Sequence, residues 1–267
     1  MINNNPLIIA HRGASASAPE NTLAAFQRAI DDKADGIEFD VRLAKDGVPV
    51  VFHDSTLKRL AKIKGCVNDF TAAELGGIDV GSWFNKSHPE HAADKFCAET
   101  VPTLEVVLNF LREYKNLVYI ELKGKEAVIS ELSEAVCSLL KSTNLMPNVV
   151  VKSFKLEGVK TTKRILPEVR TAALFEPKVL TILRKKKRIL EEAKKCHADE
   201  ISIHYSLATE KFVRRAREQG FPTAIWTANS RAWVKHAFDA GIKAIITNKP
   251  AQLLAKREEI LKDRRWF

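Results

Sequence analysis

The chain has 267 residues, 45% of them hydrophobic, which is enough for one large domain or two small ones. Its net charge of +10 comes from 43 basic and 33 acidic residues, and the basic residues are dispersed except for short runs at 184–188 and 262–265. Because a nucleic-acid-binding surface needs clustered positive charge, the composition argues against a nucleic-acid partner.

Apolar runs typical of buried strands alternate with amphipathic helical patterns. Strands are predicted at 7–10, 36–41, 117–122, 149–154, 169–174, 200–203, 223–227 and 244–247. Helices are predicted at 22–32, 104–114, 125–141, 155–165, 179–195, 209–219, 231–240 and 251–261. The basic run at 184–188 falls in one of these helical patterns, where a solvated helix face is the simplest interpretation.

The alternation itself predicts the fold class. Nearly continuous hydrophobic strands separated by helices indicate a parallel sheet covered by helices. Eight such repeats over about 250 residues fit an α/β fold, the closed (β/α)8 TIM barrel. An open doubly wound sheet is the alternative, but no G-x-G-x-x-G motif follows the first strand.

Residues 55–102 interrupt this rhythm. The segment contains turn-forming glycines and prolines and is longer than an ordinary strand–helix loop. Just before it, Asp46-Gly47 predicts a hairpin that leads residues 48–53 back along the sheet and places His53 at a strand end. We therefore expect residues 1–267 to form a single domain, with a small inserted subdomain at approximately 55–102 after the second barrel strand and over the active-site mouth.

Carboxylates lie late in two of the predicted strands. Glu38 and Asp40 are two residues apart in the second strand, so both side chains point to one face, opposite the apolar residues between them. Glu121 closes the third strand in the same way. Buried charges are costly unless they are paired or bind a metal. Three carboxylates suit Ca²⁺ or Mg²⁺ better than a softer transition metal.

Other reactive side chains also follow strand ends, where barrel enzymes carry their active sites. His11 and His53 are a candidate acid–base pair, because imidazole exchanges protons near neutral pH. Arg12 and Lys123 are candidate phosphate ligands that stabilise charge in the transition state, and Trp226 offers an apolar wall to the substrate. Either histidine can be the base, and either water or a substrate hydroxyl can be the nucleophile.

The run HRGASASAPENTLAAFQRAIDDKADGIEFDVRLAKDGVPVVFHD resembles the signature of the glycerophosphodiester phosphodiesterase family, in the phosphatidylinositol phospholipase C-like superfamily. The segments YIELKG, VVVKSF, AIWTAN and AIITNKP extend the resemblance over almost the whole chain. It implies metal-dependent hydrolysis of glycerophosphocholine, glycerophosphoethanolamine and similar diesters to glycerol 3-phosphate and an alcohol. It also implies that Glu38, Asp40 and Glu121 hold the divalent ion. Family members often carry an aspartate at Asn248 and an acidic residue at Lys155, but neither position belongs to the catalytic set.

Two alternatives remain at this point. One is lysophospholipase D-like or phospholipase C-like activity at the same site, for which the insertion would form a wide apolar lip from Trp83, Phe84, Phe96 and Cys97. The other is a non-catalytic barrel that binds anions or a partner protein. Such a barrel should lack a histidine or a carboxylate of the set, and none is missing.

The sequence shows no signal peptide, membrane span or C-x-x-C pair, and these features guide the prediction of compartment and partners. No basic region precedes the short apolar run near the N-terminus, and no stretch approaches the ~18 apolar residues of a membrane span. The four cysteines are widely spaced without a C-x-x-C pair, which favours free thiols in a reducing compartment. We expect a cytoplasmic protein whose partner is a small-molecule phosphodiester, with no stable membrane anchor; its oligomeric state is left open.

Overall fold

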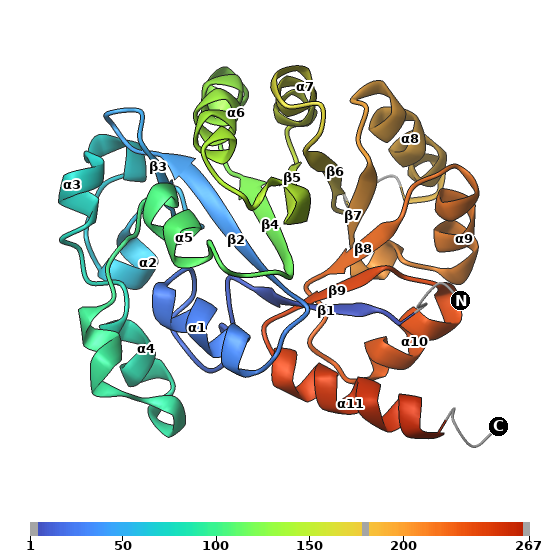
Figure 1. Ribbon diagram of the computed structural model, residues 1–267, viewed down its shortest axis with the longest axis horizontal. Coiled ribbons are helices and arrows are strands. Elements are labelled where there is room, and N and C mark those ends of the chain that lie inside the picture. The colour runs from blue at the N-terminus through green and yellow to red at the C-terminus, as the bar shows by residue number, and fades with distance from the viewer. Residues whose placement is uncertain (1–4, 178–181, 264–267) are drawn as a thin grey trace.

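The computed structural model describes residues 5–177 and 182–263, so the first residues of the helix predicted at 179–195 lie outside it. Within those ranges eight parallel strands close a barrel (Figure 1). They are β1 (Leu7–His11), β2 (Gly36–Leu43), β4 (Leu117–Leu122), β5 (Val149–Ser153), β6 (Arg170–Phe175), β7 (Glu200–His204), β8 (Thr223–Trp226) and β9 (Ala244–Thr247). Pairing of β1 with both β2 and β9 closes the ring, which confirms the predicted (β/α)8 barrel.

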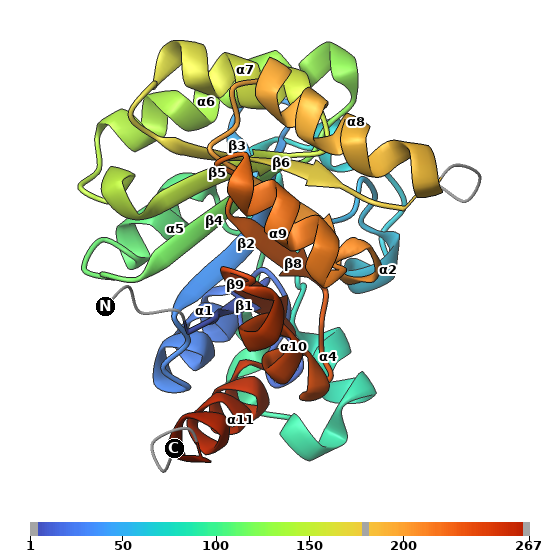
Figure 2. The same cartoon turned by 90° about the vertical axis from the view of Figure 1, so that its right-hand side faces the viewer.

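Helices cover the outside of the barrel (Figure 2). They are α1 (Leu23–Asp31), α5 (Leu104–Phe110), α6 (Glu126–Lys141), α7 (Leu156–Ile165), α8 (Ile182–Lys195), α9 (Glu210–Glu218), α10 (Ala232–Ala240) and α11 (Pro250–Asp263). The helix predicted at 104–114 is shorter than expected, because the chain turns after Phe110 and Tyr114 donates its hydroxyl to the carbonyl of Ala34 at 3.2 Å. Among the described helices, none combines the length and hydropathy needed to cross a bilayer.

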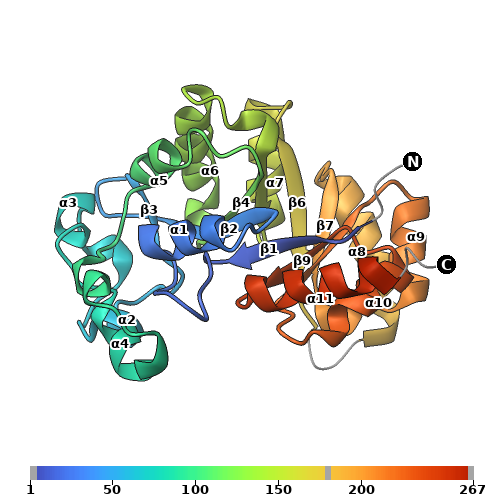
Figure 3. The ribbon, with the colours of Figure 1, turned by 60° about the horizontal axis from the view of Figure 1, so that its bottom comes forward.

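The predicted hairpin and insertion follow β2. Strand β3 (Pro49–Val51) pairs antiparallel with β2. The segment after it contains α2 (Lys58–Ala61), α3 (Ala72–Leu75) and α4 (Ser82–Ser87), with single 3-10 turns between and after them at Val67–Asp69, Pro89–His91 and Asp94–Ala98. Of these short elements, α2 and α3 pack with Val50 of β3, whereas α4 lies on the side of α1 (Figure 3). Phe84 and Phe96 of the insertion pack against Ala25 of α1, so an apolar contact fixes the insertion to the barrel.

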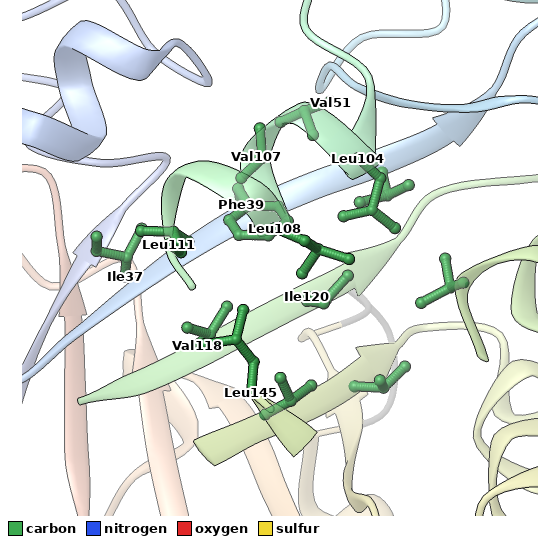
Figure 4. Packing of buried hydrophobic residues seen from close by; sticks show 14 of the residues in the cluster. Ile37, Phe39, Val51, Leu104, Val107, Leu108, Leu111, Val118, Ile120 and Leu145 are labelled. Atoms are coloured by element: carbon green, nitrogen blue, oxygen red, sulfur yellow. The ribbon is translucent and has the colours of Figure 1, made fainter. Parts of the chain in front are cut away.

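Successive side chains along each strand point alternately to the outside and to the inside of the barrel. Ile37 and Phe39 of β2 lie in a buried cluster with Leu104 and Leu108 of α5, between the sheet and that helix (Figure 4). The intervening side chains of β2 must therefore point into the barrel. A separate buried cluster of Ile9, Tyr119, Val150, Ala172, Ala224, Ala244 and Ile246 comes from the alternate positions of the other strands. The carboxylates predicted for the site, Glu38, Asp40 and Glu121, thus share the barrel's interior face.

The loop from β1 to α1 depends on a glycine. Gly13 has a φ of +78°, and a Cβ there would lie 2.5 Å from the backbone carbon of Ala25. The loop after His11 and Arg12 can therefore approach α1 only because residue 13 has no side chain.

Gly13→Ala should lower the free energy of unfolding by roughly 2–3 kcal/mol, because both the left-handed backbone and the contact with α1 become unfavourable. Gly220→Ala is the matched control, since Gly220 has a φ of +84° but nothing within 4 Å of an added Cβ. The control should lose only about 1 kcal/mol. Urea denaturation measures both values, and equal losses would show that the close approach to α1 contributes nothing.

Candidate active site

Strand register brings the predicted residues into one cluster at the carboxyl ends of β1, β2, β4 and β5. His11 of β1 is the register partner of Glu38, and Asp40 is the partner of Glu121. One strand further on, Glu121 is the partner of Lys152. Because neighbouring strands lie about 4.8 Å apart, these side chains are held against one another by the barrel itself.

The three carboxylates are almost inaccessible to solvent. Glu38 and Asp40 are 0% exposed and Glu121 is 4% exposed. Each offers an oxygen within 4.8 Å of the others. One oxygen of each, Oε1 of Glu38, Oδ1 of Asp40 and Oε1 of Glu121, faces a lysine ammonium group, that of Lys152 for Glu38 and that of Lys123 for the other two. Converging carboxylate oxygens are the donor set that Ca²⁺ or Mg²⁺ requires, so these residues fit a hard divalent ion.

Two cations lie beside this cluster on the side of the mouth. Arg12 Nε lies 3.2 Å from Asp40 Oδ2, and Lys123 Nζ lies 3.3 Å from Asp40 Oδ1 while also pairing with Glu121. Burial alone would raise the pKa of Asp40, but the charges of Lys123 and Arg12 hold that pKa well below its usual range. Asp40 is therefore ionised throughout the neutral range. The side chains of Arg12 and Lys123 are 17% and 16% exposed, so they remain accessible to a phosphate.

His11 is oriented by an amide. Its Nδ1 donates to the side-chain oxygen of Asn248 at 2.7 Å, while Nε2 lies 3.9 Å from Glu38 Oε2. Burial lowers the pKa of His11 and outweighs the opposite effect of the Glu38 carboxylate, while the charge of Arg12 acts in the same direction as burial. A neutral ring with hydrogen on Nδ1 keeps the Nε2 lone pair available. Asn248, which the sequence predicts to lie outside the catalytic set, is in direct contact with His11.

His53 is oriented by a carboxylate instead. It follows β3, as the hairpin predicted, and its Nδ1 donates to Asp54 Oδ1 at 2.6 Å. Arg42 donates two hydrogen bonds to the His53 carbonyl, at 2.8 and 2.6 Å, and so fixes the backbone. The amide of Phe52, the preceding residue, donates to the carbonyl of Asp40 at 3.0 Å, which places His53 beside the strand that carries Asp40.

An arginine from the insertion joins the two sides of the mouth, and sequence reasoning missed it. Arg59 of α2 donates to both oxygens of Glu20 at 2.8 and 2.7 Å, and its Nε donates to Asp54 at 2.6 Å. Glu20 in turn accepts a bond from Arg12 at 2.8 Å. Ion pairs therefore run without interruption from Arg12 through Glu20, Arg59 and Asp54 to His53.

A second missed residue is Lys152 of β5. Its Nζ lies 2.8 Å from Glu38 Oε1 and 3.4 Å from Glu121 Oε2, and its side chain is 1% exposed. The sequence does contain a signal for it, because a charged residue in the apolar strand VVVKS must either be buried with a partner or interrupt the strand.

Aromatic side chains form another part of the mouth. Trp226 at the end of β8 contacts Phe154 and His204 edge to face, with ring centroids 5.3 and 5.4 Å apart. Lys123 Nζ lies 5.7 Å from the centre of the Phe154 ring, so this wall reaches the charged cluster. The structure thus brings Trp226 to the same opening as the phosphate-ligand candidates.

Comparison with known proteins identifies the family. The model of the Glycerophosphoryl diester phosphodiesterase family matches residues 11–252. A glycerophosphodiester phosphodiesterase of Bacillus subtilis is 33% identical over 249 residues, covering 91% of this chain and 84% of the relative. A glycerophosphodiester phosphodiesterase of Caldanaerobacter subterraneus is 32% identical, and the match covers 93% of this chain and 96% of that relative.

A solved structure agrees. An Oleispira antarctica phosphodiesterase, in complex with the product sn-glycerol-3-phosphate, superposes with a TM-score of 0.83 at 26% identity, covering 95% of this chain and 97% of that one. The chain thus belongs to the glycerophosphoryl diester phosphodiesterase family. It is an enzyme of that family, a glycerophosphodiester phosphodiesterase, rather than a non-catalytic barrel.

Arg59→Gln should reduce the free energy of unfolding by about 1 kcal/mol near neutral pH. Burial alone would raise the pKa values of Glu20 and Asp54, but bonds from Arg59, with help from Arg12 and His53, lower both. A carboxylate with a lowered pKa stabilises the fold above its unfolded pKa, and this contribution is lost as the pH falls through the folded pKa. The difference from wild type should therefore be complete near pH 7 and shrink towards about pH 3.

Urea denaturation at the two pH values measures this change. Arg112→Gln is a suitable control, since Arg112 and its partner Glu113 are 75% and 78% exposed. The control should alter stability little at either pH. A loss in Arg59→Gln that is as large in acid as at neutral pH would mean that the arginine acts through packing alone.

Proposed function

We propose that this enzyme hydrolyses glycerophosphodiesters such as glycerophosphocholine and glycerophosphoethanolamine to glycerol 3-phosphate and the free alcohol, with a divalent ion, Ca²⁺ or Mg²⁺, and a two-histidine acid–base pair. The observation that carries the proposal is the group of three buried carboxylates, which lies against two cations and 3.9 Å from the oriented ring of His11. The product named for the Oleispira antarctica relative, sn-glycerol-3-phosphate, supports the same reaction here.

Glu38, Asp40 and Glu121 would hold the ion, since each offers an oxygen within 4.8 Å of the others. When bound, a divalent ion polarises the phosphoryl group and stabilises negative charge on its oxygens. The remaining binding comes from the protein's own cations. Arg12 and Lys123 lie at the open side of the cluster, where their donors can bind phosphate oxygens and stabilise the charge that develops on them.

The two histidines would divide proton transfer according to their partners. His11 donates to the neutral amide of Asn248, an arrangement that leaves Nε2 free to accept a proton from the attacking hydroxyl. His53 donates to the Asp54 carboxylate, which complements a positively charged ring and suits a proton donor to the leaving alkoxide. The attacking hydroxyl belongs either to a water molecule or to the glycerol of the substrate. If the glycerol hydroxyl attacks, a cyclic phosphate forms first and water then opens it.

The surroundings of the mouth favour a small polar diester over a lipid. Phe84 and Phe96, two of the aromatic residues considered for an acyl-binding lip, are 0% and 5% exposed and pack against α1. The residue of the insertion that approaches His53 is Arg59, which pairs with Asp54 beside the His53 ring. These contacts argue against lysophospholipase D-like activity. They also support the inference that residues 1–267 act as one domain, with the insertion of approximately 55–102 as part of the site.

Removal of divalent ions should abolish the release of choline from glycerophosphocholine, and excess Ca²⁺ or Mg²⁺ should restore it. An enzymatic choline assay before and after thorough treatment with EDTA measures this. Turnover that survives chelation would remove the divalent ion from the proposed mechanism while leaving the acid–base pair in place.

Substitutions of the carboxylates and of the phosphate ligands should affect metal binding and turnover differently. Glu38→Ala or Asp40→Ala should weaken metal binding, and excess metal should partly restore turnover. Arg12→Ala should lower kcat/KM by ~10²-fold or more without rescue by metal, because its charge acts on the phosphate. Calorimetric titration of Ca²⁺ separates the cases, and unchanged affinity in both carboxylate variants would make the pair structural.

His11→Ala and His53→Ala should each lower kcat by ~10²-fold or more, because each variant loses one proton-transfer partner. In the double variant the losses should not multiply, since both residues serve the same bond cleavage. Steady-state kinetics with glycerophosphocholine give the three values. A single variant with nearly wild-type kcat would exclude that histidine as acid or base.

A further inference from the structure

A lysine lies on the closed side of the carboxylate cluster. On β5 the side chains of Val149 and Val151 pack outward in the core beneath the helices, while Val150 lies in the interior cluster. Alternation therefore sends Lys152 into the barrel, one step nearer the mouth than Val150. There its Nζ contacts Glu38 and Glu121, two of the three proposed metal ligands.

Lys152 lies between two carboxylates. Its Nζ is 2.8 Å from Glu38 Oε1 and 3.4 Å from Glu121 Oε2, and the side chains of Lys152 and Glu38 are 1% and 0% exposed. Buried groups of opposite charge at such distances take the place of solvent for each other, so Lys152 is placed as the counter-charge of these carboxylates.

The cluster is consequently balanced before any ion binds. Glu38, Asp40 and Glu121 supply three negative charges, and Lys152, Lys123 and Arg12 supply three positive ones. Three carboxylates without such partners would attract a divalent ion strongly. Here an incoming ion must share the carboxylate oxygens with ammonium groups of its own sign.

The three cations differ in their freedom to move away. Lys123 and Arg12 lie at the open side, with side chains 16% and 17% exposed, and can turn towards a bound phosphate. Lys152 is 1% exposed, beneath the cluster, and both of its ion pairs are with proposed metal ligands. Its charge therefore remains within a few ångströms of a bound ion, where repulsion between like charges is weakly screened.

We propose that Lys152 is a fixed counter-cation of the metal site, which holds Glu38 and Glu121 ionised and in place and lowers the affinity of the site for divalent ions. This inference rests on the divalent site proposed above and assigns the control of its affinity to one residue of β5. Lys152 acts on the ion and its ligands rather than on the substrate, so it is a positioning residue.

The test is calorimetric titration of Ca²⁺, and separately of Mg²⁺, into the metal-free full-length protein. Lys152→Met keeps the length of the side chain and removes its charge, and it should bind the ion at least ~10-fold more tightly than wild type. The thermal unfolding midpoint of this variant should rise more on addition of Ca²⁺ than that of wild type, because tighter binding to the folded state stabilises it more.

Lys155→Met is the matched control. Lys155 lies three residues further along the chain, but its side chain is 43% exposed and pairs with Glu126, so its loss should leave metal affinity unchanged. Lys152→Gln provides a second neutral variant if the methionine does not fold, because its amide can still donate a hydrogen bond to one carboxylate. The glutamine variant should also bind more tightly than wild type.

The outcomes separate this inference from the proposed function. Measurable binding in wild type with equal or weaker binding in the neutral variants would overturn the role of Lys152 while leaving the divalent site intact. No heat of binding in wild type or in either Lys152 variant, together with turnover that resists chelation, would overturn both. Tighter binding in Lys155→Met as well would show that overall charge, rather than the position of Lys152, sets the affinity.

Discussion

The active site depends on the neutralisation, by nearby cations, of the negative charge of three carboxylates buried inside the barrel. Removing even one carboxylate from water costs several kcal/mol unless a partner of opposite charge replaces the solvent. The strand register limits which residues can pair with these carboxylates. The positions next to them in the sheet belong to β1 and β5, and the loops after β1 and β4 line the mouth above them. Arg12, Lys123 and Lys152 come from these elements. The same three contacts hold the cluster ionised and determine what else can bind to it.

A second electrostatic layer surrounds the first. Arg12, which contacts Asp40, also contacts Glu20, and Arg59 extends the pairing to Asp54 beside His53. The insertion is therefore coupled to the site through one arginine of α2, while its Phe84 and Phe96 pack against α1 instead. A loop that supplies a charge pair to the mouth is constrained at that point even where the rest of it is exposed.

The local alternation of apolar and charged residues in the sequence predicts much of this architecture. The alternation of Glu38 and Asp40 with apolar neighbours was sufficient to place both in the interior of a predicted barrel. Lys152 obeys the same rule, but a lysine near a strand end is ordinarily a solvated residue, so the pattern alone did not single it out. Arg59 and Asn248 carry no such signal. Their partners lie 39 and 237 residues away along the chain, and only the closure of the barrel and the path of the insertion bring them together.

The contrast between fixed and accessible cations has a consequence for the order of events in the proposed reaction. Before substrate arrives, Arg12 and Lys123 are engaged by Asp40, so phosphate binding must compete with that carboxylate. A divalent ion on the carboxylates would weaken their hold on both cations and release them towards phosphate. Linkage then requires the converse, that phosphate binding increases the affinity for the ion. Lys152 cannot take part in this exchange because it is enclosed, and for that reason its charge opposes the ion equally in the free and substrate-bound states.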